Sequence, residues 1–419
     1  MLRTLASIYS LLLAVAVLLT GIGLLSTLLG VRAGVEHYGQ VTIGLIMSSY
    51  FVGYGLGTFL CPALIRRVGH IRAFAAMAAV ASAVAVGHAL WVNPWTWGAL
   101  RAVSGVCTVG LYMVIESWLN VLTPGAARGR VFSTYIGVSL LAMAGGQYLL
   151  LTADVTGFQL FAAASMLFSL ALVPVALTRV VQPTPVEVPH VTLAHLFRVS
   201  PLGSISALIA GLTGGAFWGM GAVFASGLGL DRGGIAAFMS ATILGGALLQ
   251  WPVGHFSDNH DRRTVMMVVC FLAAGAAGAA FAMTWVSQWA LVAAAFAYGG
   301  LSFPVYGLAV AHTNDHLETT QVLEATRGLL LLYGLGAAVG PTGAGLAMGV
   351  LGPASLMAFF AAAFGVLGLF ALRRMYVRPP PVSTAEQAEY VAMMRTSPVA
   401  LEMDPRTEAE PELDLSGPR

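Results

Sequence analysis

The sequence predicts an all-α membrane protein with twelve transmembrane helices, and three observations lead to that prediction. Of the 419 residues, 58% are hydrophobic and only 9% are charged, whereas about a quarter of an ordinary soluble domain is charged. The apolar residues form runs as long as the roughly 20 residues that a helix needs to cross a bilayer. The charges gather near the end of the chain, where 12 of the 45 residues from 375 to 419 are acidic or basic.

Charged residues and breaks that contain proline or glycine separate the twelve hydrophobic runs. The first run follows Arg3 and exceeds the apolar part of a secretory signal peptide, so we expect it to remain as a span. In chain order, the expected spans cover residues 7–29, 41–65, 73–92, 95–121, 131–151, 159–178, 201–227, 235–256, 265–284, 288–312, 328–348 and 354–373.

Arginine placement predicts the orientation of these spans. With the N-terminus in the cytoplasm, the outer connections hold only Arg32 and Arg232, and Arg101 lies just inside the fourth span. The cytoplasmic side then holds Arg3, Arg66, Arg67, Arg72, Arg128, Arg130, Arg179, Arg198, Arg262, Arg263, Arg327, Arg373, Arg374 and Arg378. This asymmetry follows the positive-inside rule, so we expect both termini in the cytoplasm.

An internal repeat divides the chain into two halves. Trp91 recurs as Trp285 at an offset of 194. Arg128 recurs as Arg327 at an offset of 199, and in both places a glycine follows the arginine. The expected divisions are an N-terminal six-helix half over residues 1–178, a cytoplasmic linker over 179–200, a C-terminal six-helix half over 201–374, and a disordered acidic cytoplasmic tail over 375–419. The tail is rich in proline and acid, a composition that cannot bury a core, although its run 384–395 is compatible with a short amphipathic helix.

Several chemistries are excluded by composition. All 20 basic residues are arginine, so the chain has no Walker A lysine for an ATP-driven pump and no lysine for a pyridoxal Schiff base. Cys61, Cys107 and Cys270 have neither CxxC nor histidine spacing beside them, which argues against a disulfide framework and a zinc site. The arginines form no contiguous patch for nucleic acid. We expect no cofactor, no metal, no nucleic-acid partner and, without a nucleophile and base within the spans, no enzyme.

The connection between the eighth and ninth spans carries the strongest motif. Gly254, Asp258, Asp261, Arg262 and Arg263 lie there at spacings similar to the loop signature of the major facilitator superfamily. Glycine lets two helices approach, and the acidic and basic residues can form charge pairs at helix ends that break when the halves rock. The equivalent loop of the first half keeps its glycine and basic residues but has an arginine in place of the acid; it contains Arg66, Gly69 and Arg72.

Three further stretches support this resemblance. Arg101 to Gly105 is similar to the RxxxG motif of the superfamily's fourth span. Gly340-Pro341 on the eleventh span resembles a GxxxGP motif that antiporters of the superfamily usually carry on the fifth span, where this chain has Leu141-Ala142 instead. Close helix packing through small residues is an equal alternative for this stretch. The stretch Leu111 to Asn120 is followed by Arg128 to Arg130, Asn314-Asp315 and Tyr333 to Gly336, a combination that resembles the YcaD-like bacterial branch of the superfamily.

The resemblance implies the major facilitator fold, in which two parallel six-helix repeats surround a midplane site. It also implies a multi-pass protein of the bacterial plasma (inner) membrane that works as a monomer in the lipid bilayer by alternating access. It supplies no substrate. The residues we associate with gating are those of the two loops together with Arg128, Arg327, Gly340 and Pro341.

The fourth span carries a polar stripe. Arg101, Gly105, Thr108, Tyr112 and Glu116 follow one another at steps of 4, 3, 4 and 4 and therefore share one face of a helix. Glu116 is the first candidate for proton coupling, since it is the only acid well inside a span and burial disfavours the charged form of a carboxyl group. A structural pair with Arg128, Arg130 or Arg327 is the alternative.

Other candidates could contact a substrate. Arg101 could hold an anionic group or assist proton exchange from the outer side, or it could only snorkel to the outer interface. The aromatic candidates for a cavity lining are Tyr112, Trp218, Tyr298 and Tyr306. His312 and His316 lie four residues apart with Glu318 close behind, and we interpret them as solvated loop residues, not as metal ligands.

We therefore predict a secondary transporter that moves a small organic molecule and is driven by a proton gradient. Apolar aromatic candidates and few charges favour efflux over uptake. A uniporter that needs no titrating residue is one alternative. The other is a membrane sensor or scaffold that keeps the fold without a transport cycle.

Overall fold

The computed structural model describes residues 2–123, 128–177, 193–317, 319–377, 387, 390–391 and 396–403. Within these residues, twelve helices are long and apolar enough to cross a membrane, which confirms the predicted number. The helices are α1 (Leu2–Val35), α2 (Gln40–Val68), α3 (His70–Leu90), α4 (Pro94–Leu122), α5 (Arg128–Gln147), α6 (Gln159–Leu170), α7 (Leu172–Leu177), α8 (Leu193–Val199), α9 (Pro201–Gly227), α10 (Arg232–Asp258), α11 (Arg262–Met283), α12 (Gln288–Ser302), α13 (Pro304–Asn314), α14 (Thr319–Leu351) and α15 (Ser355–Val377). Short 3-10 helices add η2 (Tyr148–Leu151) and η3 (Ala400–Met403).

Local sequence sets several helix starts. Asn93 accepts hydrogen bonds from the backbone of the first turn of α4, and a proline occupies the first helical position, where its missing N–H is not needed. Asp231 caps α10 and Asp261 caps α11 in the same way. The tenth span is divided between α12 and α13 because Pro304 begins the second piece. The eleventh span begins at Thr319, earlier than the expected residue 328, because no glycine or proline lies between these two positions to interrupt the helix.

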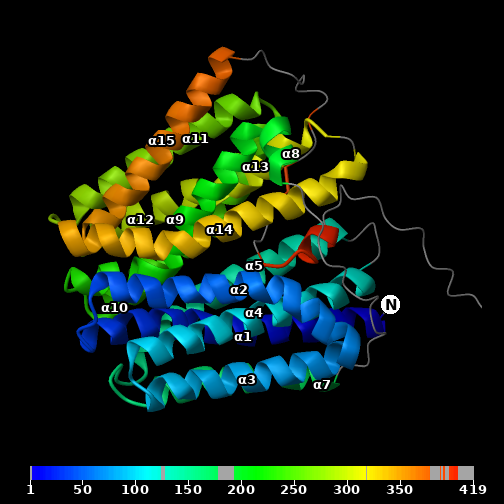
Figure 1. Cartoon of the computed structure of the whole chain (residues 1–419), viewed down its shortest axis with the longest axis vertical. Coiled ribbons are helices and arrows are strands. Elements are labelled where there is room, and N and C mark those ends of the chain that lie inside the picture. Colours follow the sequence, from blue (N-terminus) through cyan, green and yellow to red (C-terminus); the bar gives the residue numbers. More distant parts are fainter. Residues whose placement is uncertain are drawn as a thin grey trace, which may run out of the picture.

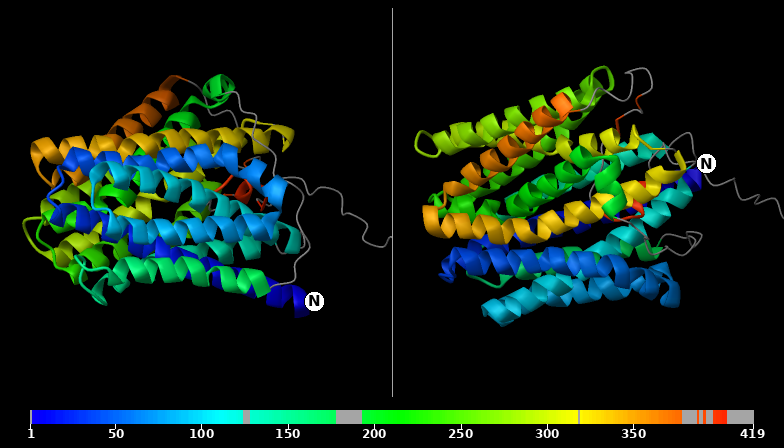
Figure 2. Two further views of the ribbon diagram at one scale, coloured as in Figure 1. Left: turned by 60° about the horizontal axis from the view of Figure 1, so that its bottom comes forward. Right: turned by 45° about the horizontal axis from the view of Figure 1, so that its top comes forward.

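The two halves repeat the same helix contacts, which agrees with the sequence repeat (Figures 1 and 2). In the first half α2 packs on α4 and α1 on α5, and in the second half α10 packs on α12 and α9 on α14. Across the halves, α1 meets α9, α2 meets α14, and α5 meets α10. The contacts between the halves therefore follow the pseudo-two-fold symmetry of the fold: the α2–α14 contact corresponds to the α10–α5 contact.

Glycines allow the closest of these helix pairs to form. On α14, a Cβ atom at Gly336 or Gly340 would overlap the carbonyl oxygen of Leu208 or Leu212 on α9. Small residues at such positions let two backbones approach, as is common in membrane helices. The structure thus supports the packing role that we gave as the alternative for this glycine-rich stretch.

Replacing Gly336 with alanine is expected to lower the unfolding free energy by about 1–3 kcal/mol, the usual cost of overpacking. The neighbouring substitution Gly334→Ala is the matched control, because a Cβ atom there meets nothing within 4 Å. Thermal unfolding of both variants in detergent measures the difference. Equal midpoints for the two variants would contradict the close α9–α14 packing.

The halves are packed together at the end of the bundle where α1 ends and α2 begins, here called the far end. The opposite end, where α1 begins, is the N-terminal end. At the far end the Ser48 and Thr342 hydroxyls lie 2.8 Å apart, and Ser240 donates to the carbonyl oxygen of Ala144 at 2.8 Å. Arg232 also donates to the Ala153 carbonyl at 2.6 Å. The far end is therefore closed by contacts between the halves.

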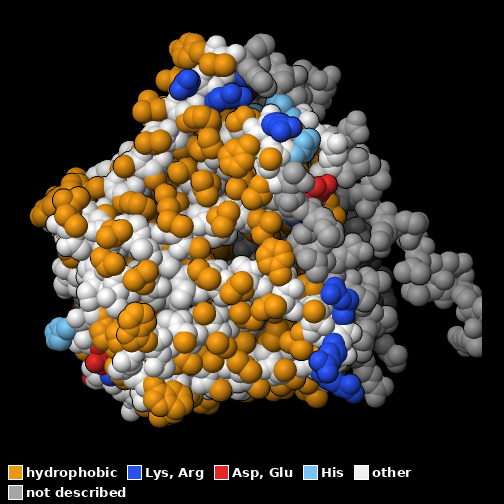
Figure 3. Space-filling model, viewed as in Figure 1, with side chains coloured by type: hydrophobic (Ala, Val, Ile, Leu, Met, Phe, Trp, Pro, Cys, Tyr) orange, Lys and Arg blue, Asp and Glu red, His pale blue; other side chains and the backbone are white. Residues whose placement is uncertain are grey.

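Apolar side chains dominate the coloured surface of the face that Figure 3 shows, as a lipid-facing surface requires. Leu45, Leu248 and Leu272 are among the large apolar residues that are more than half exposed. In the same view, arginines gather at the margin on the side where Figure 1 places the N-terminus. This distribution is the one that the positive-inside pattern predicted for that side.

The tail differs from expectation in one segment. We predicted disorder over residues 375–419, yet residues 396–401 are buried and η3 packs against α4, α5 and α14. Val399, Ala400 and Leu401 supply apolar surface for this packing, so for this segment the prediction is wrong. Residues 404–419, most of the run 384–395 and residues 178–192 of the linker region lie outside the described residues. The rest of the expected linker contains α8.

Candidate functional site

A cavity of about 570 Å³ lies between the halves, within the size range of small-molecule sites. Its walls come from α1, α2, α4 and α5 of the first half and from α9, α10 and α14 of the second, with Phe303 between α12 and α13. The lining is mostly apolar and aromatic. Its polar and aromatic members include Tyr50, Tyr54, Thr58, Arg101, Tyr112, Trp218, Gln250, Phe303, Arg327, Tyr333 and Thr396.

The cavity also reaches the apolar outer surface between α2 and α14. Val52 and Leu56 of α2 and Leu335 of α14 line it, and each is at least half exposed. Figure 3 shows the surface hollowed at this place, between the two helices labelled in Figure 1. We call this opening the α2–α14 portal. An apolar molecule could pass through it without leaving a hydrocarbon environment.

Arg101 lies inside the protein and not at its surface. The side chain is 3% exposed, lines the cavity, and places its guanidinium carbon 4.4 Å from the centre of the Tyr50 ring. This is a cation–π contact, and the Arg101 Nε atom has no hydrogen-bond partner among the described residues. The snorkelling alternative is therefore wrong, and the site presents a buried positive charge with unused hydrogen-bonding capacity.

Two of the four predicted aromatic residues line the cavity and two do not. Tyr112 and Trp218 are in the lining. Tyr298 instead stacks on Phe360 of α15, with ring centroids 4.9 Å apart, and so packs inside the second half. Tyr306 is fully buried and contacts the ring of Tyr333 at 5.2 Å, behind the cavity wall. For Tyr298 and Tyr306 the lining prediction is wrong, because their helix faces turn into the second half.

Sequence reasoning missed several lining residues. Tyr50 and Tyr54 lie four residues apart on α2, so they share a helix face, and this spacing was a signal that could have found them. Gln250, Phe303 and Tyr333 are single residues in apolar surroundings, and nothing in their local sequence marks them as cavity residues.

Glu116 is buried in the second half of α4, toward the N-terminal end of the bundle. It is 0% exposed and accepts a 2.6 Å hydrogen bond from the hydroxyl of Tyr135 on α5. Its second carboxyl oxygen accepts a hydrogen bond from the hydroxyl of Ser397 in the tail. No basic side chain among the described residues lies within ion-pair distance of this carboxyl group. Arg130 and Arg327 therefore do not pair with it, and the Arg128 side chain lies outside the described residues.

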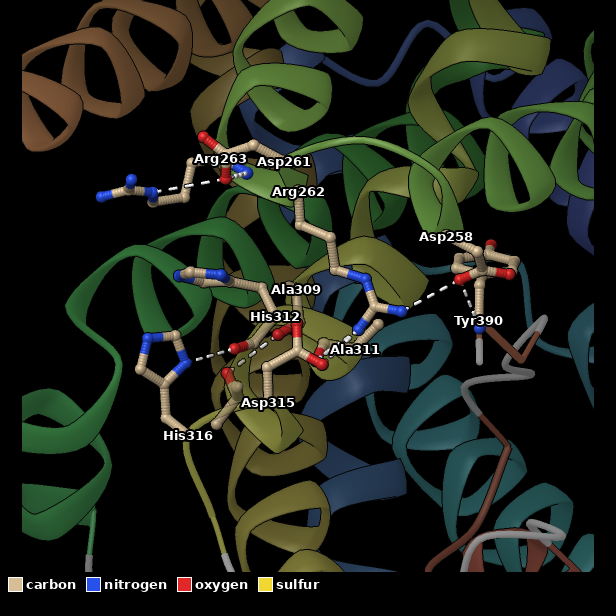
Figure 4. A network of polar contacts seen from close by, with 11 residues as sticks. Asp258, Asp261, Arg262, Arg263, Ala309, Ala311, His312, Asp315, His316 and Tyr390 are labelled. Atoms are coloured by element: carbon tan, nitrogen blue, oxygen red, sulfur yellow. Dashed lines mark hydrogen bonds and ion pairs between the residues drawn. The ribbon is translucent and has the colours of Figure 1, made fainter. Parts of the chain in front are cut away.

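The loop between α10 and α11, which carries the motif, holds a charge network (Figure 4). Arg262 is 1% exposed and contacts Asp258 at 2.9 Å and Asp315 at 2.6 Å. It also donates to the carbonyl oxygen of Ala311 at 3.0 Å. The predicted charge pair is present, and Asp315, which sequence reasoning had not assigned to it, is its most buried acid. The network joins α10, α11 and the end of α13, all within the second half.

The other residues of the two motif loops take part in a close ring contact, a helix cap and a turn between helices. Gly254 lies directly against the ring of Tyr390, and Asp261 contacts Arg263 at 3.5 Å while capping α11. In the first half, Gly69 joins α2 to α3 with φ of 83°, a conformation that favours glycine, and Arg72 is exposed.

The histidine pair differs from its predicted surroundings. His312 is buried at the end of α13, and the His316 ring lies 4.8 Å from it. The solvated-loop interpretation is wrong for His312, because α13 continues past it to Asn314. The described residues contain no group of three or more metal-ligand side chains, and Glu318 lies outside them.

Sequence comparison finds relatives along most of the chain. The family model described as Major Facilitator Superfamily matches residues 203–401. A protein of Escherichia coli O7:K1, described as the uncharacterized MFS-type transporter YcaD, is 27% identical over 376 residues, which cover 89% of this chain and 97% of that protein. The YcaD protein of Shigella flexneri matches to the same extent. These matches confirm the predicted resemblance to that branch.

Solved structures share the fold. The nucleoside transporter NupG superposes with a TM-score of 0.72 at 13% identity, covering 89% of this chain and 99% of that chain. A bacterial homologue of the human lysosomal transporter Spinster, in an inward-facing and occupied conformation, gives 0.70 at 14% identity, with coverage of 91% and 97%. The human organic anion transporter MFSD10 gives 0.60 at 14% identity, with coverage of 88% and 99%. The predicted fold of two six-helix halves is thereby confirmed.

Proposed function

We propose that this chain is a transporter of the major facilitator superfamily, and that it is a proton-coupled secondary transporter that exports a small organic molecule. In this proposal it works as a monomer in the bacterial inner membrane, with its N-terminal end in the cytoplasm. The halves rock about the central cavity, so that the cavity opens to one side and then to the other.

The observation that carries the proposal is the buried guanidinium of Arg101 in a mostly apolar cavity whose lining also includes Arg327. A buried charge is costly in a membrane protein and by default indicates function. The cavity around it is lined by rings such as Tyr112 and Trp218. This combination fits a substrate with an apolar or aromatic body and one acidic group, because a guanidinium binds a carboxylate through two parallel hydrogen bonds.

Proton coupling is assigned to Glu116. Its carboxyl group has hydroxyl partners and no cationic partner among the described residues, so it can change protonation state without leaving a buried arginine unpaired. Arg101 and Glu116 lie on one helix, 15 residues apart, which is about 22 Å of helical rise. Substrate and proton therefore bind at different depths and are coupled through movement of the halves.

Export is favoured by the α2–α14 portal. A molecule dissolved in the membrane can reach the cavity through Val52, Leu56 and Leu335, and closing this portal while the far end opens would release it on the other side. In this scheme the gating residues lie toward the two ends of the bundle. They include the loop residues around Asp258 at the N-terminal end and the Gly340-Pro341 segment of α14 toward the far end.

Proteoliposomes loaded with a pH-sensitive dye test the proposal. Purified protein is first screened by thermal shift against aromatic acids, their neutral amides and matched amines, and the stabilising compounds are then assayed for flux. We expect the acids to bind and to move protons when a pH gradient is imposed. Substrate flux that ignores the gradient would establish the uniporter alternative. Binding without any flux would establish the sensor or scaffold.

The substitution Arg101→Gln is expected to weaken binding of a stabilising acid by about 10- to 100-fold, the loss that corresponds to hydrogen bonds with a charged group. Binding of the matched neutral amide should change less than twofold. Arg198→Gln is the control, because this arginine is exposed on α8. Thermal-shift titrations of the parent and both variants with the acid and with the amide give these affinities. An Arg101 variant that binds the acid normally would remove Arg101 from the substrate site.

A further inference from the structure

A short segment of the tail, residues 396–401, lies at the N-terminal end of the cavity. Thr396 and Pro398 form part of the cavity lining. Ser397, Val399, Ala400 and Leu401 are at most 1% exposed. A chain segment that follows the last span, α15, has therefore returned into the bundle, where it appears in red in Figure 1, on the same side as the N-terminus.

The first half holds this segment by two hydrogen bonds. The Tyr54 hydroxyl donates to the carbonyl oxygen of Thr396, and the Ser397 hydroxyl donates to the Glu116 carboxyl group. The same Ser397 oxygen accepts from the backbone N–H of Val399 at 3.1 Å, which fixes the turn that leads into η3. The segment thus has a defined conformation and a specific binding partner in α4.

The second half holds the tail a few residues earlier. The backbone N–H of Tyr390 donates to Asp258 at 2.7 Å, the acid that also pairs with Arg262 (Figure 4). The Tyr390 ring lies against Gly254 of α10 and Gly307 of α13, where a Cβ atom at either glycine would overlap it. Both glycines therefore leave room for this ring.

The tail joins the two halves at the end opposite to their direct contacts. Ser48, Thr342 and Ser240 hold the halves together at the far end, whereas Tyr390 and Ser397 connect them at the N-terminal end. We propose that residues 396–401, anchored by Tyr390, form an intramolecular plug that closes the N-terminal side of the cavity. The plug must leave before water-soluble molecules reach the cavity from that side and before the halves rock.

The access of water-soluble molecules to the cavity can be measured without knowing the transported molecule, so the test does not depend on the proposed transport function. Thr58 lines the cavity one helical turn from Tyr54, and the substitution Thr58→Cys places a reporter thiol there. The native cysteines Cys61, Cys107 and Cys270 are buried. Labelling of the parent chain measures how far these cysteines react on their own. The protein is held in lipid nanodiscs and treated with a charged, membrane-impermeant maleimide, which cannot use the apolar portal.

Two truncations separate the plug from the rest of the tail. A chain that ends at Arg395 lacks the plug, and a chain that ends at Met403 keeps it and lacks only residues 404–419. Labelling of the reporter thiol is expected to rise about tenfold or more in the shorter chain, a factor typical of losing one hydrogen bond to a charged group. It should change less than twofold in the longer one. Equal labelling in the two truncations would overturn the proposal.

Single substitutions guard against misfolding of the shorter chain. Ser397→Asp sets a second carboxyl group against Glu116 and should raise labelling of the reporter thiol, since like charges in a buried site repel. Ser416→Asp adds the same charge outside the plug and should not. In the Glu116→Gln background the effect of Ser397→Asp should shrink, because the repelling partner is gone. Unchanged labelling in Ser397→Asp with a normal unfolding midpoint would exclude a plug held by Glu116.

Discussion

Replacing Glu116 with glutamine is expected to reduce proton movement in the proteoliposome assay to the level of protein-free liposomes, while the protein remains folded. Glutamine keeps the shape of the side chain, and its amide can still accept from Tyr135 and donate toward Ser397. The glutamine side chain cannot take up or release a proton in the pH range of the assay. The measurement is the dye response to a binding compound under a pH gradient, with the thermal unfolding midpoint recorded in parallel.

Glu324→Gln is the matched control, since Glu324 is an exposed acid on α14. It should leave the proton movement within about twofold of the parent. Proton movement that survives in the Glu116 variant would mean that another group carries the proton. A collapse of the unfolding midpoint would instead assign Glu116 a structural role, which the conservative variant Glu116→Asp should then partly restore.

Replacing Arg262 with leucine is expected to lower the unfolding free energy by about 3–5 kcal/mol, the cost of leaving buried charge without its partner. Asp315 is 3% exposed and contacts Arg262 at 2.6 Å, and the leucine removes this charge pair at the end of α13. Urea or thermal unfolding in detergent gives the size of the loss. Arg72→Leu, which removes an exposed arginine, should cost less than about 1 kcal/mol.

The double variant Arg262→Leu with Asp315→Asn separates charge from packing. If loss of the charge pair is the cause, the second substitution should recover a large part of the stability lost in the first. A double variant that is no more stable than Arg262→Leu would instead attribute the loss to the hydrogen bond with the Ala311 carbonyl and to the packing of the side chain.

The membrane architecture could be predicted because each span is long and bounded by a local signal. In the structure, side-chain caps at Asn93, Ser200 and Asp231 fix three of the helix starts. The eleventh span shows the limit of this reasoning. Its first turns, from Thr319, are polar, so hydrophobicity alone placed the start near residue 328 although the helix continues unbroken.

The site could be predicted only where several polar residues share one helix face. The stripe on α4 led to Arg101, Tyr112 and Glu116, and the first two line the cavity. Glu116 lies behind the lining, in contact with α5 and the tail. On the tenth span, Tyr298 and Tyr306 are not part of a polar stripe. Whether their rings face the cavity or the second half depends on how α12 and α13 pack. That packing is a tertiary property.

The tail segment was missed for a different reason. Its composition predicts disorder, and three consecutive apolar residues from Val399 to Leu401 are too short a run for a periodicity argument. Their burial depends on a space between α4, α5 and α14 that exists only in the assembled bundle. A similar limit applies to Asp315, whose pairing with Arg262 joins residues 53 positions apart.

The contacts that close the far end have an electrical consequence. Ser48, Thr342 and Ser240 are neutral, and of the described contacts named there only that of Arg232 uses a charged group, which donates to a backbone carbonyl. Separating the halves at that end therefore moves little charge through the membrane field, which acts with about 2.3 kcal/mol per elementary charge at 100 mV. The opening movement itself is expected to be nearly insensitive to membrane voltage. If proton and cargo are exchanged as proposed, any voltage dependence of the cycle would then report the net charge that this exchange moves across the membrane.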